Sequence, residues 1–171
     1  PGDHARRAKE AGLLVLHQVQ TVAGARAAAD AGVDVIIAQG GEAGGHAGSV
    51  ATMALVPQTV DIAGGIPVIA AGGIADGRGL VAALALGAQG VMMGTRFVAA
   101  EESGSQPRHR ERVVAATADD TLFTGVFDVI DGMTWPAGIS GRVIRTPFAD
   151  EWHGREPELA EQRTAILAES S

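Results

Sequence analysis

The chain has 171 residues, of which 46% are hydrophobic and 19% are charged, a balance typical of a globular domain. Its formal net charge of −7 argues against nucleic acid as the main partner, because a nucleic-acid-binding protein needs a basic face to neutralise phosphates. The sequence contains no cysteine, which excludes disulfides and thiolate metal sites. We expect a cytoplasmic protein without a membrane span, since the N-terminus has no apolar leader and no apolar run reaches ~18 residues.

Four short apolar segments, rich in Val and Ile, predict the strands of a parallel sheet. They cover residues 13–19, 33–39, 67–71 and 90–93. Segments of this kind, separated by glycines and helical patterns, are typical of repeated strand–helix–strand units. We therefore expect a buried strand at each of the four positions.

Helical patterns connect or follow these strands. They cover residues 21–31, 56–64 and 76–86. Thr21 and Asp76 are residue types that favour the N-cap position, so each predicts the start of its helix. The sequence thus alternates strand and helix along its first hundred residues.

Residues 29–37 and 85–92 share one layout, in which a helix end is followed by a glycine and a strand. Repetition of this layout is expected of successive units in a (β/α)8 barrel. A doubly wound open sheet uses the same units and stays an alternative, although its glycine-rich loop follows the first strand. We predict that residues 1–100 form the C-terminal part of a (β/α)8 TIM barrel.

Four strands cannot close such a barrel, which typically needs eight strands and about 250 residues. The N-terminal half is therefore expected in a longer full-length protein or in a partner chain. Residues 101–171 have a different character, because charged helical patterns at 111–118 and 158–169 flank a loop-rich middle at 131–148. We expect a helical and loop extension there, acting as an active-site cover or as a C-terminal wrap, with Trp135 as a packing or lid residue.

Two glycine turns follow the third and fourth predicted strands, at the barrel face where active sites lie. Gly72 and Gly73 allow main-chain N–H groups to approach phosphate oxygens, and Gly94 and Thr95 add further donors and a hydroxyl. Tight turns without any ligand are the alternative. The occurrence of two such turns at adjacent strand ends favours a phosphate site.

A third loop, residues 39–48, follows the second predicted strand and carries a histidine. Gly44 and Gly45 allow its backbone to lie against a flat ligand. The neutral imidazole of His46 can take a proton near pH 7, or its N–H can orient an anionic substrate. A histidine that only caps its own loop is the alternative, and no second ligand at metal-binding spacing accompanies it, so we predict no metal site.

Several stretches of the sequence resemble the nitronate monooxygenase family, formerly called 2-nitropropane dioxygenases. The most specific are EAGGHAG at 42–48, preceded by AQG at 38–40, and the continuous segment PVIAAGGIADGRGLVAALALGAQGVMMGTRF at 67–97. VLHQVQT at 15–21 and GRVIRTPFADEWHGREPEL at 141–159 are also similar to members of the family. The resemblance covers nearly the whole chain.

The resemblance implies a TIM barrel with bound FMN that oxidises alkyl nitronates or nitroalkanes with dioxygen to a carbonyl compound and nitrite. In this sequence it places His46 at the catalytic histidine. It places Gln39 and Gly44, with the adjacent Gly45, against the flavin, and Gln18 is a further expected flavin contact. The residues that it assigns to the ribityl-phosphate end are Gly72, Gly73, Met93, Gly94 and Thr95.

Other functions stay open at this stage. An FMN-dependent enoyl-acyl-carrier-protein reductase shares the EAGGH and AAGGIADG motifs and would need NAD(P)H and a long acyl substrate. A barrel that binds a sugar phosphate without flavin is a second alternative, although Lys9 is the only lysine and precedes the first strand, which argues against Schiff-base chemistry. The third is a fragment that folds and binds nothing.

Overall fold

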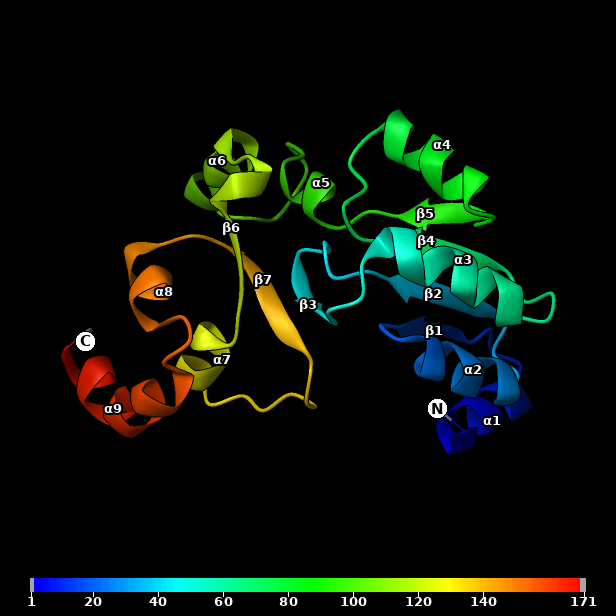
Figure 1. The fold of residues 1–171 in the computed structure, drawn as a ribbon, viewed down its shortest axis with the longest axis horizontal. Helices are drawn as coiled ribbons and strands as arrows, with labels where there is room; N and C mark the ends of the chain where they lie inside the picture. Colours follow the sequence, from blue (N-terminus) through cyan, green and yellow to red (C-terminus); the bar gives the residue numbers. More distant parts are fainter. Residues whose placement is uncertain (1, 170–171) are drawn as a thin grey trace. The chain divides into compact units, whose positions relative to one another are not determined.

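The computed structural model describes residues 2–169, and its first part contains a four-stranded parallel sheet (Figure 1). The strands are β1 (Leu16–Val19), β2 (Val35–Gln39), β4 (Val68–Ala71) and β5 (Gly90–Met92). All four predicted strands are confirmed, each within the expected segment. Only β2 and β4 are mostly buried as expected, because β1 and β5 at the edges of the sheet include exposed residues such as Leu16 and Met92.

The order of the strands in the sheet is β1-β2-β4-β5, so each is hydrogen-bonded to the next strand of the series. A doubly wound sheet reverses its order at a switch point, whereas a (β/α)8 barrel adds strands in one direction. The sequential order therefore favours the barrel segment over the open sheet. The register also aligns the carboxyl ends, because Gln39 is paired with Ala71 and Ala71 with Met92.

Four helices accompany this sheet. They are α1 (Gly2–Glu10), α2 (Val22–Asp30), α3 (Thr52–Ile62) and α4 (Gly77–Ala85). The predicted N-caps are confirmed, since the Thr21 side chain accepts a hydrogen bond from the amide of Gly24 and Asp76 accepts one from the amide of Arg78. Local capping thus defines the start of α2 and of α4.

Helix α3 begins at Thr52, ahead of the expected residue 56. The helical pattern read from the sequence covered only residues 56–64. In the structure Pro57 lies inside the helix, and Ala51 at the N-cap makes no side-chain hydrogen bond. The carboxylate of Glu42 caps the helix instead, by accepting hydrogen bonds from the amide of Thr52.

The core beside the sheet is made of small and branched apolar side chains. Ala25 and Ala28 of α2 and Ile36 of β2 have no solvent exposure, and neither do Leu55 and Val56 of α3. Alanine on a helix brings its backbone close to the strand beneath it. This close packing fixes the strand ends, and so the loops that follow them.

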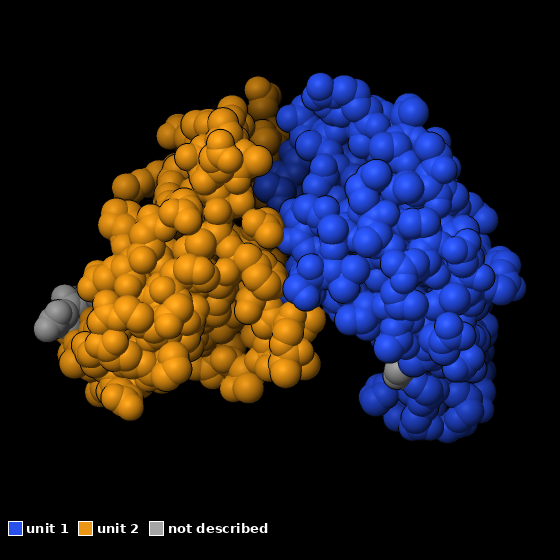
Figure 2. All heavy atoms as spheres, viewed as in Figure 1, with its two compact units in different colours: residues 1–43, 47–97 blue, residues 44–46, 98–171 orange. Residues whose placement is uncertain are grey.

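The chain divides into two compact units (Figure 2). Unit 1 contains residues 1–43 and 47–97, and unit 2 contains residues 44–46 and 98–171. The elements after β5 are α5 (Thr95–Val98), α6 (Pro107–Ala115), a 3-10 helix (Ala118–Asp120), β6 (Thr121–Thr124), α7 (Val126–Asp131), β7 (Ser140–Ile144), α8 (Pro147–Trp152) and α9 (Glu156–Glu169). None of the helices in residues 2–169 has both the length and the apolar character that crossing a membrane requires.

Unit 2 differs from the sequence-based expectation of helices and loops, because it also contains β-structure. A three-stranded sheet has the order β3-β7-β6, where β3 is Gly45–Ala47 and β6 is antiparallel to β7. These strands are short and carry polar and charged residues, so no apolar run marks them. Helix α9 matches its predicted segment, and α6 begins earlier than residue 111 because Pro107 occupies its first turn.

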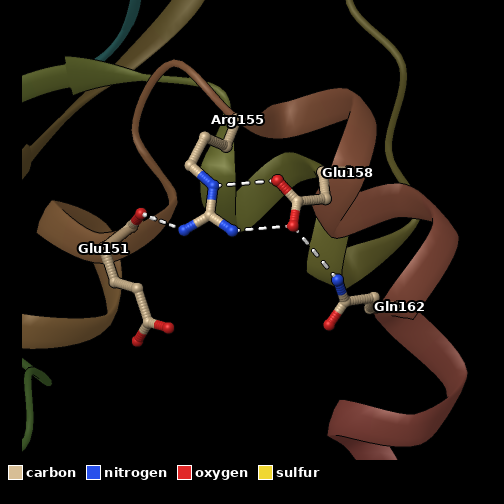
Figure 3. Close-up of polar contacts among 4 residues, drawn as sticks. All are labelled: Glu151, Arg155, Glu158 and Gln162. Atoms are coloured by element: carbon tan, nitrogen blue, oxygen red, sulfur yellow. Dashed lines mark hydrogen bonds and ion pairs between the residues drawn. The ribbon is translucent and has the colours of Figure 1, made fainter.

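The helices of unit 2 pack around a small core of Val126, Trp152 and Leu159. Arg155 links α8 to α9 next to this core (Figure 3). Its Nε and Nη2 donate to the carboxylate of Glu158 at 2.9 and 2.7 Å, and its Nη1 donates to the carbonyl oxygen of Glu151 at 3.4 Å. The same guanidinium lies over the ring of Trp152, 4.7 Å from its centroid.

Candidate functional site

Glutamine side chains meet at the carboxyl ends of β1 and β2. The Oε1 atom of Gln39 accepts hydrogen bonds from the Nε2 atoms of Gln18 and Gln20, both at 2.9 Å. Gln39 is buried, with 7% of its surface exposed, so these two bonds satisfy its amide oxygen in the interior. The structure therefore brings together two predicted site residues, Gln18 and Gln39, and adds Gln20, which the sequence analysis missed.

The two glycine turns lie at the ends of neighbouring strands, as predicted from their sequence positions. Gly72 and Gly73 directly follow β4, and Met93 and Gly94 directly follow β5, its hydrogen-bonded neighbour. Gly72 and Gly73 have φ values of +106° and +68°, which only glycine adopts without strain. The main-chain conformation of the first turn therefore requires glycine.

Main-chain donors are available at these turns. Within residues 2–169, the amides of Gly73, Gly94 and Thr95 donate no hydrogen bond to a protein acceptor. All three residues are exposed. Successive N–H groups of this kind form a concave surface that binds anions.

The glycines at the strand ends serve different purposes. A Cβ at Gly40 would overlap Thr52 and lie 2.6 Å from its Cα, and one at Gly72 would lie 2.9 Å from the carbonyl oxygen of Gly40. A Cβ at Gly94 would meet nothing within 4 Å, and Gly94 has no positive φ. Protein packing therefore explains Gly40 and Gly72 but gives no reason for glycine at position 94.

Glu42 ties the loop after β2 to the turn after β4. Its two carboxylate oxygens accept from the amide of Thr52 at 3.1 and 2.9 Å. The Thr52 hydroxyl lies 2.9 Å from Glu42 Oε2 and 3.1 Å from the carbonyl oxygen of Gly72, and its single proton serves one of them at a time. This clamp was not foreseen, because Glu42 lies ten positions before Thr52 in the sequence.

The N-terminus of α4 is occupied by a protein carboxylate. Asp76 accepts hydrogen bonds from the amide of Arg78 at 2.9 Å and from its guanidinium at 3.0 and 2.6 Å. These bonds, that to the guanidinium first, lower the pKa of Asp76 to about 2. This helix end is therefore already paired with an anionic group of the protein.

His46 belongs to unit 2, where it has two side-chain partners. Its Nε2 lies 2.7 Å from Oδ1 of Asp128, which is on α7 and has 9% of its surface exposed. Its ring stacks on that of Trp135, with centroids 4.0 Å apart and planes inclined by 21°. Gly45, which precedes it, has a φ of +75°. The sequence analysis singled out His46 but missed Asp128.

No group of three or more His, Asp or Glu side chains within residues 2–169 is arranged to hold a metal ion. A cavity of about 480 Å³ lies between α1 and β1, and it is lined by Leu13, Leu14 and Leu16 among others. It borders the amino end of β1, away from the carboxyl ends that carry the glycine turns. His17 is part of its wall, and burial lowers the pKa of that imidazole.

The sequence and structure were compared with known proteins. A sequence model described as nitronate monooxygenase matches residues 1–155. The chain belongs to the nitronate monooxygenase family. The resemblance expected from the motifs is therefore confirmed, and the matched range contains every predicted site residue.

Three similar proteins carry different names. One from Staphylococcus aureus, named "Probable nitronate monooxygenase", is 44% identical over 164 residues, covering 90% of this chain and 43% of the relative. A carboxyl-CoA dehydrogenase of Mycobacterium tuberculosis, named for a hydroxy-methyl-oxo-octahydroindene group, is 45% identical over 147 residues. The match covers 85% of this chain and 39% of that relative. The solved structure of FabK from Thermotoga maritima is 43% identical, with a TM-score of 0.83. The match covers 98% of this chain and 51% of the FabK chain.

This nitronate monooxygenase family member spans about two fifths of the length of those curated relatives and about half of the solved chain. The coverage and the sequential parallel strands identify the fold as the C-terminal part of a (β/α)8 barrel. That the predicted site residues bind a ligand stays a prediction.

Proposed function

We propose that the complete protein is an FMN-dependent oxidoreductase that oxidises alkyl nitronates or nitroalkanes with dioxygen to a carbonyl compound and nitrite. Membership of the nitronate monooxygenase family supports this proposal. The observation that carries it is the pair of glycine turns at neighbouring strand ends, whose amides donate to no protein acceptor. Such turns are suited to one dianionic group such as the phosphate of FMN.

The residues of unit 1 fit the phosphate end of FMN. The amides of Gly73, Gly94 and Thr95 supply hydrogen-bond donors, and Gly94 adds a surface without a side chain. By the family resemblance, Gly72 and Met93 complete this end, and Gln18, Gln39, Gly44 and Gly45 line the flavin. When bound, FMN supplies the redox chemistry, namely electron transfer from the substrate and on to dioxygen.

His46 is the residue of this chain that we propose handles the substrate's proton. With a neutral nitroalkane, its imidazole takes the proton from the carbon beside the nitro group, and the electron pair of the broken C–H bond forms the C=N bond of the nitronate. With a nitronate supplied as such, no proton is removed and the imidazole only orients the anion. The two substrates therefore separate proton transfer from binding.

The other half of the barrel is also part of the proposal. Leu13, Leu14 and Leu16 beside β1 are 61%, 79% and 58% exposed, an unusual apolar cluster for the end of a parallel sheet. Within residues 2–169, β1 and β5 each have a single neighbour in that sheet. We propose that an N-terminal half, in a longer chain or a partner chain, covers these edges. We call this chain together with that half the complete protein.

The first experiment is an absorbance spectrum of the purified complete protein, followed by oxygen uptake with a nitronate. Flavin absorbance with nitronate-dependent oxygen consumption is the expected result. A colourless protein that takes up no FMN argues for a sugar-phosphate barrel or an inactive fragment. Relatives at 45% and 44% identity carry names for different reactions, so a second activity, that of the enoyl reductase which shares the EAGGH motif, is tested too. NADH consumption with a crotonyl thioester in the absence of oxygen indicates that reductase.

A single added methyl group tests whether the glycine turns bind the phosphate of FMN. In Gly94→Ala the added Cβ meets no protein atom, so folding is preserved, and it intrudes only on a ligand that rests there. We expect the Kd for FMN to rise about tenfold, from a steric cost of ~1–3 kcal/mol. Gly104→Ala is the matched control, since position 104 is equally open and has no positive φ. Equal FMN affinity in the two variants contradicts the placement of the phosphate.

A further inference from the structure

We propose that Asp128 is a positioning residue that fixes the tautomer of His46, so that Nδ1 is the atom that accepts the substrate's proton. This inference rests on the proposed function for its catalytic meaning, but the hydrogen bond itself does not. Asp128 comes from α7, which neither the motifs nor the family resemblance assigned to the site. The proposal makes unit 2 the support of the imidazole rather than a passive extension.

The hydrogen bond decides which ring nitrogen carries the proton. A carboxylate can only accept, so the 2.7 Å contact with Asp128 Oδ1 requires Nε2 of His46 to be the donor. A neutral imidazole has a single N–H, which leaves Nδ1 with an unshared electron pair. Within the described residues no protein group is hydrogen-bonded to Nδ1. Nδ1 is therefore the nitrogen available for a proton.

The ring of Trp135 restrains the imidazole in a second direction. The hydrogen bond at Nε2 fixes one point but permits the imidazole to swing about that bond. Stacking at a centroid distance of 4.0 Å covers one face of the ring and limits this swing. Gly141 of β7 lies close to the same nitrogen, since a Cβ there would make an ordinary contact with Nε2 at 3.8 Å.

The backbone that carries Asp128 is held in place at the end of α7. The main-chain oxygen of Asp128 accepts from the amide of Met133 at 2.8 Å, and Gly132 ends the helix with a φ of +71°. Arg163 of α9 donates from Nε to the carbonyl oxygen of Ile130 at 2.9 Å. A fixed backbone lets the carboxylate orient the ring, as carboxylates hydrogen-bonded to other functional histidines do.

The charge balance of the proton transfer gives Asp128 a second effect. When Nδ1 takes the proton from the nitroalkane carbon, the ring becomes a cation while the substrate becomes an anionic nitronate. The carboxylate beside Nε2 stabilises that cation without receiving the proton. The effect applies to neutral nitroalkanes and not to nitronates, which arrive without the proton.

The test that does not depend on activity is ¹⁵N NMR of the histidine rings in the complete protein, at a pH where the ring is neutral. His46→Asn identifies the His46 signals by their loss. We expect a pyrrole-type shift for Nε2 and a pyridine-type shift for Nδ1. In Asp128→Asn the side-chain amide can donate to Nε2, and the pattern should reverse at least in part. A wild-type ring with the proton on Nδ1 overturns the proposal, whatever the enzyme does.

The kinetic arm uses Asp131→Asn as the control, because Asp131 lies on the same helix, is exposed and makes no hydrogen bond to His46. Asp128→Asn should lower kcat for a neutral nitroalkane at least about 100-fold with little change in KM. Oxidation of the corresponding nitronate should change less than about fivefold, because it needs no general base. Equal losses with both substrates indicate a merely structural role and contradict the proposal. If the wild type oxidises neither, the proposed function fails while the NMR result still stands.

Discussion

The two places where predicted site residues gather are built by opposite means. At the glycine turns of unit 1, the groups that we propose bind phosphate are main-chain amides, those of Gly73, Gly94 and Thr95. In unit 2 the group that we propose acts on the substrate is the side chain of His46, which contacts the side chains of Asp128 and Trp135. The glycine turns thus offer backbone groups, whereas the second place offers a side chain.

This difference determines which substitutions each site tolerates. A main-chain donor is present in every residue but proline, so the turns depend on conformation and on the space that an absent Cβ leaves. The imidazole depends on one carboxylate and one aromatic ring, whose loss no neighbour replaces. We therefore expect the glycine turns of unit 1 to be disturbed mainly by substitutions that add atoms. We expect the orientation of the His46 imidazole in unit 2 to be disturbed mainly by substitutions that remove a partner.

The largest expected effect comes from removing the imidazole. His46→Asn should lower kcat for a neutral nitroalkane by about 10²–10⁴-fold, the usual contribution of a general base. FMN should remain bound, because the proposed phosphate donors are main-chain groups of unit 1. Oxygen uptake and flavin absorbance measure the two outcomes on one sample. Unchanged turnover of the neutral substrate removes His46 from the mechanism.

The next effect tests the sensitivity of unit 1 to added atoms. Gly40→Ala places a Cβ 2.6 Å from the Cα of Thr52, against main chain that cannot move without shifting α3. We expect a loss of unfolding free energy at or above ~3 kcal/mol, the upper end for overpacking. Chemical denaturation of the complete protein measures it, with Gly94→Ala as the tolerated counterpart. Equal stability of the two variants shows that the loop after β2 is not packed as described.

The strand ends could be predicted from sequence because their determinants are local. Apolar runs, caps such as Thr21 and Asp76, and paired glycines each occupy a few consecutive residues. The start of α3 was misplaced because its cap, Glu42, lies ten positions before Thr52 and outside the helix. A hydrogen bond from the Thr52 amide to a side chain so far back in the sequence leaves no local signal for the start of the helix.

The surroundings of His46 could not be predicted, since they depend on contacts between distant positions. Asp128 is separated from His46 by 82 positions, and no pattern near either residue signals the pair. Strands β6 and β7 were also missed, because their residues alternate without an apolar run. The resemblance to a family indicated the histidine but not the group that holds it.

A smaller effect tests the clamp between the two loops of unit 1. Glu42→Ala removes the cap of α3, and we expect a loss of about 1 kcal/mol of unfolding free energy, as for other helix caps. Denaturant titration measures it. The clamp also reaches the turn after β4, because the Thr52 hydroxyl beside Glu42 lies 3.1 Å from the carbonyl oxygen of Gly72. Weaker FMN binding should accompany the loss of stability, and FMN affinity equal to wild type would show that the turn holds its shape alone.

The smallest effect concerns Asp76, where unit 1 does use a side chain. The Arg78 guanidinium is the largest cause of its low pKa, about 2, so Arg78→Ala should raise that pKa toward the ordinary 3.8. The rise should be incomplete, because the amide of residue 78 still donates to the carboxylate. The folded-state pKa of Asp76 lies below the ordinary carboxyl value. The ionised cap therefore contributes its full stabilising free energy above the ordinary carboxyl pKa, and this contribution is lost as the pH falls toward about 2. In the variant this loss is smaller and is complete at a higher pH.

Carboxyl ¹³C NMR across an acid titration measures the Asp76 midpoint directly. Arg26→Ala is the control, because it removes the same charge from an exposed position on α2 that makes no hydrogen bond to Asp76. Only Arg78→Ala should move the midpoint. FMN affinity should be unchanged, since Asp76 already occupies the end of α4 and the phosphate is proposed to rely on the turns. A loss of FMN binding in Arg78→Ala but not in Arg26→Ala assigns Arg78 to the phosphate and shows that the phosphate site in unit 1 is not built from main chain alone.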